Sequence, residues 1–246
     1  MTKSAVSPLS VSGLTVAYGE KLALWDVSYE APLGALIGVI GPNGAGKSTF
    51  IKAVLGLVPR IGGQIRILGL PPARGLARVG YVPQRASVDW DFPATALDVA
   101  AMGLYRTLGW LRPVDRAARR TARDCLARMG LEDRADAQIG QLSGGQQQRV
   151  FLARALAQNA DLYFMDEPLT GVDAATEEAI MAIFRDLKSQ GRTVIAVHHD
   201  LESVPRYFDH VLILNVEAVA SGPVGKAFTR DALRRAYGGR LGEAVS

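Results

Sequence analysis

Cysteine is nearly absent from the sequence. Cys125 is the only one, so no disulfide bond can form within the chain, and a reducing compartment is favoured. Only three histidines accompany it, and their spacing offers no cluster suited to a structural metal site. Long hydrophobic runs are also missing: no stretch approaches about 18 apolar residues, and the first residues lack the apolar segment of a secretory signal. We therefore expect neither a structural zinc site nor a membrane-spanning helix.

The remaining composition is that of a globular protein. Hydrophobic residues make up 48% of the 246 residues and charged residues 21%, which is enough to build the core of one large domain or two small ones. The net charge of +4 is compatible with phosphate ligands or an anionic membrane surface. It is too weak to indicate nucleic acid as a partner.

Apolar stretches separated by turn residues predict alternating strands and helices. We expect strands at Leu9–Tyr18, Leu24–Tyr29, Leu36–Ile40, Gln64–Leu68, Arg78–Val82, Leu162–Met165, Thr193–Val197 and Val211–Leu214. The expected helices are Ser48–Leu57, Thr95–Leu104, Val114–Met129, Ser143–Gln158, Ala174–Ser189, Asp200–Tyr207 and Lys226–Tyr237. This order predicts an α/β protein with a mainly parallel sheet. We expect one domain over 1–246, in which 1–85 and 157–246 form the core with a small antiparallel β subdomain. Residues 86–156 would be an inserted α-helical subdomain.

A glycine-rich segment lies between a predicted strand and a predicted helix. It matches the pattern G-x-x-x-x-G-K-[ST] and comprises Gly41, Pro42, Asn43, Gly44, Ala45, Gly46, Lys47 and Ser48, followed by Thr49. Glycines let the backbone N–H groups approach a polyphosphate, and the helix N-terminus adds partial positive charge. Lys47 can then reach the β- and γ-phosphates, and the Ser48 hydroxyl can bind Mg²⁺. The pattern predicts a P-loop NTPase core but does not separate ATPases from GTPases and kinases.

A second motif is the apolar strand Leu162–Met165, which ends in two carboxylates, Asp166 and Glu167. Asp166 would lie beside the phosphate loop and help to hold Mg²⁺. Glu167 would polarise the attacking water, and its carboxylate neighbour raises the pKa of such a base.

The segment Leu142-Ser143-Gly144-Gly145-Gln146 opens a further helix and makes a second helix start suited to an anion. The glycine-rich segment, this LSGGQ segment and the strand that ends in Asp166-Glu167 follow one another along the chain. With these motifs in that order, nearly the whole chain resembles the ATP-binding cassette (ABC) ATPases. The resemblance implies a head-to-tail homodimer on ATP, in which Ser143, Gly144, Gly145 and Gln146 of one copy close on the γ-phosphate held by the other.

The resemblance also implies roles for single residues. Tyr18 would stack on adenine, Gln84 would touch Mg²⁺ and the attacking water, and Asp173 would contact the opposite subunit. Gly171-Val172 departs from the serine more usual in that loop. His199 matches the histidine that contacts the γ-phosphate and positions the water, while His198 is expected to pack or to form a local hydrogen bond.

The function expected from the resemblance is that of the ATP-hydrolysing subunit of a membrane transporter, with ATP and Mg²⁺ as cofactors. Separate permease subunits would dock near Gln84 to Leu97, and an extracytoplasmic substrate-binding protein would belong to the same system. The subunit would sit peripherally on the cytoplasmic face of the cell membrane. The alternative is a non-transport ABC ATPase acting in DNA repair or on the ribosome, and another is an inactive ATP-sensing module.

The cargo is inferred from the segment Val82–Pro93, which continues to Tyr105 and contains Trp90, Phe92 and Leu97. This segment is similar to the corresponding region of ATPases in the manganese, zinc and iron importer family. The resemblance implies a divalent metal, with manganese first and zinc or iron as alternatives.

Overall fold

The computed structural model describes residues 6–84, 92–109 and 113–238. In these parts the strands are β1 (Leu9–Tyr18), β2 (Lys21–Glu30), β3 (Leu36–Ile40), β4 (Gly62–Ile67), β5 (Val79–Val82), β6 (Leu162–Met165), β7 (Thr193–Val197), β8 (His210–Asn215) and β9 (Glu217–Pro223). The helices are α1 (Lys47–Val54), α2 (Pro72–Gly75), α3 (Ala96–Ala101), α4 (Tyr105–Leu108), α5 (Arg116–Arg128), α6 (Gly144–Ala157), α7 (Ala174–Ser189), α8 (Val204–Tyr207), α9 (Val224–Ala227) and α10 (Arg230–Tyr237).

The central sheet has the strand order β5-β6-β7-β3-β8-β9. All its neighbouring strands pair in parallel except β9, which runs antiparallel to β8. A separate antiparallel sheet has the order β2-β1-β4. The predicted α/β fold, with a mainly parallel sheet and a small antiparallel one, is confirmed.

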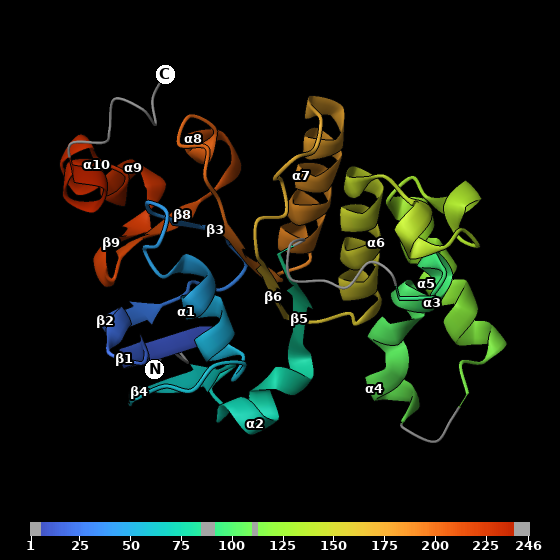
Figure 1. Ribbon diagram of the computed structural model, residues 1–246, viewed down its shortest axis with the longest axis horizontal. Coiled ribbons are helices and arrows are strands. Elements are labelled where there is room, and N and C mark those ends of the chain that lie inside the picture. Colours follow the sequence, from blue (N-terminus) through green and yellow to red (C-terminus); the bar gives the residue numbers. More distant parts are fainter. Residues whose placement is uncertain (1–5, 85–91, 110–112, 239–246) are drawn as a thin grey trace, which may run out of the picture.

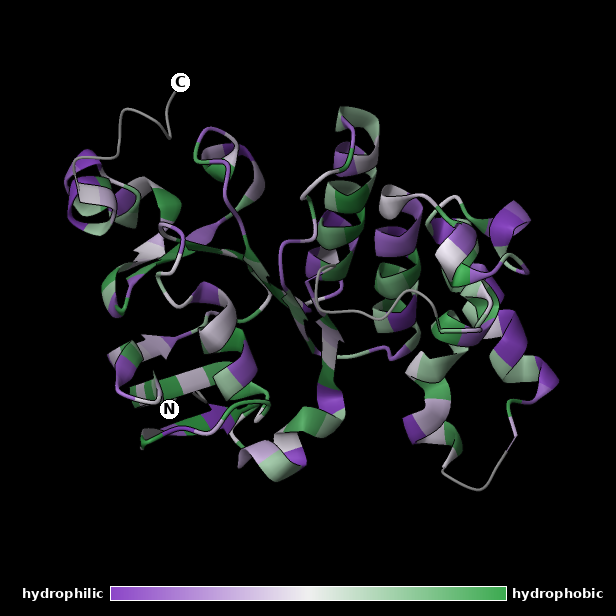
Figure 2. Ribbon diagram, viewed as in Figure 1, coloured by the Kyte–Doolittle hydropathy of each residue, from purple (hydrophilic) through white to green (hydrophobic). Residues whose placement is uncertain are grey.

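Both faces of the central sheet are covered. Leu162 and Phe164 of β6 pack into the core that contains α1 and the antiparallel sheet. Tyr163 and Met165 alternate with them and pack into the core that contains α6 and α7. In Figure 1, α1 lies between the two sheets and α7 lies on the other face. Figure 2 shows the hydrophobic residues of the central strands between these layers.

The helices α3, α5 and α6 pack on one another around buried side chains such as Leu97, Leu126 and Val150. Figure 1 shows them together at the opposite side of the molecule from β1, β2 and β4. The predicted limits of the helical subdomain remain predictions, because residue 86 lies outside the described residues and α6 ends at Ala157.

The elements near the C-terminus differ from the expected ones in three places. The strand β9 was not predicted. The helix expected over Lys226–Tyr237 is divided into α9 and α10, because Thr229 accepts a hydrogen bond from the Ala232 N–H and starts a new helix. The helix expected from Asp200 begins only at Val204, since the Asp200 side chain accepts a bond from the Glu202 N–H and forms a turn.

Parallel pairing brings the carboxyl ends of the strands to one edge of the sheet. The chain leaves β3 into the glycine-rich segment, β5 towards Gln84, β6 into Asp166-Glu167 and β7 into His198-His199. These four strands are neighbours in the sheet. The predicted site residues that follow these four strands therefore lie at a common edge, where α/β proteins bind their ligands.

Candidate nucleotide-binding site

The glycine-rich segment forms a tight loop between β3 and α1. Gly41 has a φ of 153°, and a Cβ atom there would lie 2.1 Å from the Leu214 carbonyl oxygen. Gly46 has a φ of 93°, and its Cβ would lie 2.5 Å from the Ala23 carbonyl oxygen. Both positions therefore require glycine, for conformation and for close approach of the backbone. The loop ends at the N-terminus of α1, which presents backbone N–H groups.

Lys47 is folded back along this loop. Its Nζ atom donates hydrogen bonds to the carbonyl oxygens of Gly41 at 2.7 Å and Pro42 at 2.9 Å. Burial lowers the pKa of the Lys47 ammonium, and the negative charges of Glu167 and Asp166 oppose that shift. The positive charge is thus held beside the loop by oxygen acceptors and by two carboxylates.

Ser48 and Asp166 form an oxygen pair next to Lys47. The Ser48 hydroxyl donates to Asp166 Oδ1 at 2.8 Å, and Asp166 is fully buried. Burial raises the pKa of Asp166, an effect that the Ser48 hydrogen bond opposes. Among the described residues, Asp166 Oδ2 has no hydrogen-bond partner although it is buried. An unpartnered carboxylate oxygen beside a serine hydroxyl is a donor set that fits Mg²⁺.

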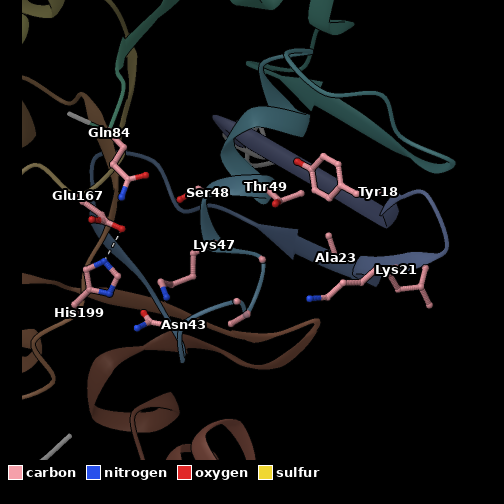
Figure 3. A pocket seen from close by; sticks show the side chains of 14 residues that line it. Tyr18, Lys21, Ala23, Asn43, Lys47, Ser48, Thr49, Gln84, Glu167 and His199 are labelled. Atoms are coloured by element: carbon pink, nitrogen blue, oxygen red, sulfur yellow. Dashed lines mark ion pairs between the residues drawn. The ribbon is translucent and has the colours of Figure 1, made fainter. Parts of the chain in front are cut away.

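Glu167 and His199 face each other across the ends of β6 and β7. His199 Nε2 lies 2.7 Å from Glu167 Oε1, and the Glu167 side chain is only 14% exposed. Glu167 has a φ of 58°, a conformation that is uncommon for residues other than glycine. Figure 3 shows this pair pointing toward Lys47 and the loop, with Gln84 on the same side.

One pocket of about 340 Å³ gathers most of the predicted site residues. Its lining consists of Tyr18, Lys21, Leu22, Ala23, Asn43, Gly44, Ala45, Gly46, Lys47, Ser48, Thr49, Gln84, Glu167 and His199. Tyr18 and Lys21 lie at one end and the Glu167–His199 pair at the other, with Lys47 between them (Figure 3). Gly41, Pro42 and Asp166 are not part of this lining. They are linked to it by hydrogen bonds, Gly41 and Pro42 to Lys47 and Asp166 to Ser48.

Sequence reasoning missed Lys21, Leu22 and Ala23, which line this pocket. They enter it because β1 and β2 form a hairpin in which Tyr18 pairs with Lys21. The turn Gly19-Glu20 in the sequence was the signal that could have found them, since a tight hairpin places the residues after the turn beside those before it.

The LSGGQ segment lies outside this pocket. Ser143 is exposed and caps α6: its hydroxyl accepts from the Gln146 N–H at 3.3 Å, and the Gln146 side chain accepts from the Ser143 N–H at 2.9 Å. Gly144 and Gly145 form the first turn of the helix. Asp173 caps α7 in the same way, with its carboxylate accepting from the Thr176 N–H at 2.8 Å. The structure therefore does not bring these residues to the pocket of their own chain.

Of the three residues singled out for the cargo and the docking surface, only one is available at the surface in the described parts. Trp90 lies outside the described residues. Phe92 is 55% exposed, whereas Leu97 is 4% exposed and packs within the helices. Leu97 is therefore wrong as a surface anchor, because α3 turns that side chain into the core.

Comparison with known proteins identifies the family. The model of the ABC transporter family matches residues 24–170. The chain belongs to the ABC transporter family. It is 55% identical over 234 residues to the manganese transport system ATP-binding protein MntB of Bacillus subtilis, covering 95% of this chain and 94% of that protein. It is also 54% identical to the zinc transport system ATP-binding protein TroB of Treponema pallidum, covering 96% and 89% respectively.

Solved ABC structures have the same fold. One is an inward-facing ABC transporter described as metal-chelate type, with a TM-score of 0.81, 26% identity and coverage of 94% of this chain and 88% of that one. Another is a dimeric ATP-binding cassette bound to ADP and phosphate, with a TM-score of 0.77, 28% identity and coverage of 88% and 98%. The chain is thus an ABC ATPase, and the predicted ATP-hydrolysing activity is confirmed at the level of the family. None of the helices in residues 6–84, 92–109 and 113–238 is long and apolar enough to cross a membrane.

Proposed function

We propose that this chain is the ATP-hydrolysing subunit of an importer for divalent metal ions, with manganese as the first candidate and zinc or iron as alternatives. The observation that carries the proposal is identity of 54–55% over almost the full length to ATP-binding proteins of manganese and zinc transport systems. The pocket at the sheet edge supports it, because it gathers the phosphate loop, Lys47, Ser48, Glu167 and His199.

ATP would lie along the pocket with its adenine on Tyr18 and its phosphates on the backbone N–H groups of residues 43–49. Tyr18 is 51% exposed at one end, which leaves its ring face free for stacking. Lys47 would exchange its bonds to Gly41 and Pro42 for the β- and γ-phosphates, which are stronger acceptors because they are charged. Ser48, Asp166 and Gln84 would hold Mg²⁺, which supplies charge neutralisation at the phosphates.

Glu167 would act as the general base. Its carboxylate lies in the pocket opposite Lys47, where it can accept a proton from the water that attacks the γ-phosphate. The His199 bond to Oε1 would orient the carboxylate, and the imidazole would also contact the γ-phosphate. Gln84 would help to position the water, since it lines the same end of the pocket.

A second copy of the chain would complete the site. The exposed Ser143 and the α6 N-terminus lie outside the pocket of their own chain, so they are available to the γ-phosphate on another copy. This fits the head-to-tail dimer, with Asp173 at the contact between the two subunits. Asp173 would keep its capping bond to Thr176 there.

Permease subunits would dock near Gln84 to Leu97, and a groove of about 340 Å³ lies along β5, the strand that leads to Gln84. Its lining consists of Leu55, Leu57, Leu76, Val79, Tyr81, Met102, Arg154 and Gln158. A helix of the permease would cover the apolar wall of this groove. The subunit would then sit peripherally on the cytoplasmic face of the membrane, and an extracytoplasmic binding protein would deliver the metal to the permease.

The test is uptake of labelled Mn²⁺, Zn²⁺ and Fe²⁺ by cells that carry the gene, lack it, or carry the Glu167→Gln variant. We expect uptake of one of these metals, Mn²⁺ first, to fall to background in the two altered strains. Unchanged uptake of all three, with loss of uptake of an amino acid, sugar or vitamin, would contradict the metal assignment and leave the ATPase assignment in place.

A further inference from the structure

His198 is a buried polar residue next to the reaction site that the proposed mechanism does not use. It follows β7 and is 5% exposed. Its backbone N–H donates to the Val39 carbonyl on β3 at 3.1 Å. Its ring packs against Tyr207, with ring centres 6.2 Å apart, and against Phe208 at 5.3 Å. His198 therefore joins three parts of the chain: the strand that leads to the phosphate loop, the end of β7, and the segment around α8.

The His198 ring is hydrogen-bonded to Ser203, whose hydroxyl also contacts Asp200. Nε2 lies 2.7 Å from the Ser203 hydroxyl oxygen. The Ser203 hydroxyl donates its only hydrogen to Asp200, whose carbonyl oxygen lies at 3.2 Å. Both contacts are satisfied together when His198 Nε2–H donates to Ser203, which is the direction we assign. Burial lowers the pKa of His198 and the neighbouring His199 lowers it further, whereas Asp200 raises it; the balance favours the neutral ring.

These hydrogen bonds connect the two ends of residues 198–203, the turn that carries His199. Ser203 is tied to His198 and to Asp200, and Asp200 Oδ1 also accepts from the Glu202 N–H at 3.0 Å. His199 lies between the two fixed points, and its Nε2 lies 2.7 Å from Glu167 Oε1. A small shift of this turn would therefore move His199 relative to Glu167.

We propose that His198 is a positioning residue for ATP hydrolysis: its bond to Ser203 holds the turn after β7 so that His199 stays within hydrogen-bond distance of Glu167. This inference rests on the proposed roles of Glu167 and His199. Misplacement of a catalytic group by about 1 Å can cost up to about 100-fold in rate, and the packing around the ring limits the shift. We expect loss of the bond to lower kcat about 10-fold while the KM for ATP stays within about twofold.

The experiment compares four variants of the full-length chain in a steady-state ATPase assay. His198→Leu removes the bond and keeps most of the volume, and Ser203→Ala removes the partner. His198→Gln keeps an amide N–H that can reach Ser203, so it should restore most of kcat. The double variant His198→Leu/Ser203→Ala should be no slower than His198→Leu, because both changes remove one interaction.

Thr193→Val is the matched structural control. Thr193 is fully buried at the other end of β7, and its hydroxyl accepts from the Gly34 N–H at 2.9 Å. Urea unfolding of each variant measures the loss of stability. We expect Thr193→Val to lose stability with unchanged kcat, whereas His198→Leu loses kcat as well. If the two variants change kcat equally, or His198→Leu keeps normal kcat while His199→Ala abolishes turnover, the positioning role is refuted. If His199→Ala also keeps normal turnover, the proposed role of His199 in ATP hydrolysis is itself refuted.

The tautomer gives an independent readout. The chain has only three histidines, so ¹⁵N-labelled histidine gives few signals, and the signal missing in His198→Gln identifies His198. We expect a neutral ring with its proton on Nε2. An Nε2 signal that is unchanged in Ser203→Ala would show that the bond is absent and would overturn the inference.

Discussion

Replacing Glu167 with Gln separates ATP binding from hydrolysis most sharply. The amide has nearly the shape of the carboxylate and can still bond His199 Nε2, which lies 2.7 Å from Oε1. It cannot accept the proton of the attacking water. A positioned general base contributes about 10²–10⁴-fold in rate, which corresponds to about 2.7–5.5 kcal/mol at about 1.36 kcal/mol per tenfold change. We therefore expect turnover to fall by about 100- to 10,000-fold.

ATP binding should survive this change. In this structure the Glu167 carboxylate contacts His199 rather than the loop, while Lys47 bonds the loop carbonyls. The variant also removes a negative charge that acts on Lys47, and less negative charge near the phosphates favours an anionic ligand. Affinity for ATP should thus be unchanged or slightly higher. With binding intact and hydrolysis blocked, the closed dimer should accumulate in ATP and Mg²⁺.

The assay combines phosphate release, equilibrium titration with ATP, and sizing of the protein in ATP with Mg²⁺. Glu202→Gln is the control, because Glu202 is an exposed carboxylate in the turn after His199, and its turnover should stay normal. A Glu167→Gln protein that stays monomeric with ATP bound, or that hydrolyses at a near-normal rate, would refute the assignment of Glu167 as the base.

Further changes test neighbouring groups. Lys47→Ala should weaken ATP binding itself, measured by titration, because the ammonium would bond the β- and γ-phosphates; unchanged affinity would mean that the phosphate loop is misplaced. His199→Ala should lower turnover far more than His198→Ala, and the reverse order would show that the other histidine contacts the phosphate. Burial lowers the pKa of His198 in the folded protein, so at mildly acidic pH the unfolded chain binds a proton at this residue that the folded protein does not. The stability that His198 contributes is therefore lost as the pH falls below its pKa in the unfolded chain, about 6.5. Between pH 7.5 and 5.5, the free energy of unfolding in urea should therefore fall more for the native protein than for His198→Gln, by at most about 1.4 kcal/mol per pH unit. An equal fall in both proteins would count against the lowered pKa of His198.

Strands and helices with complete local signals could be predicted from the sequence to the residue. The strands Leu36–Ile40, Leu162–Met165 and Thr193–Val197 are short apolar runs with clear turn residues around them, and all three agree with the structure. Ala174–Ser189 also agrees, since Asp173 is an unambiguous cap. Buried strands of a parallel sheet are almost entirely apolar, so the limits of the apolar run predict the limits of the strand.

The elements that were missed depend on tertiary contacts. β9 is an edge strand with a partly exposed pattern, and its pairing with β8 rather than local propensity makes it a strand. In the same region, Pro205 follows Val204 and restricts the start of α8. Local patterns could not show where one short helix stops and the next begins.

The residues of the site could be predicted from the sequence, because each motif follows its own strand. The order of the strands in the sheet could not be predicted in this way. Alternating strands and helices indicate that Gln84, Asp166, Glu167 and His199 reach one edge of a parallel sheet. In the observed order β5-β6-β7-β3 the strands β6 and β7 are neighbours, and that adjacency brings His199 Nε2 to 2.7 Å from Glu167 Oε1. The same order places the loop after β3 beside β7, so the phosphate end of the pocket meets the base. Motifs therefore identify the chemical groups, while the topology of the sheet decides which of them can act on one another.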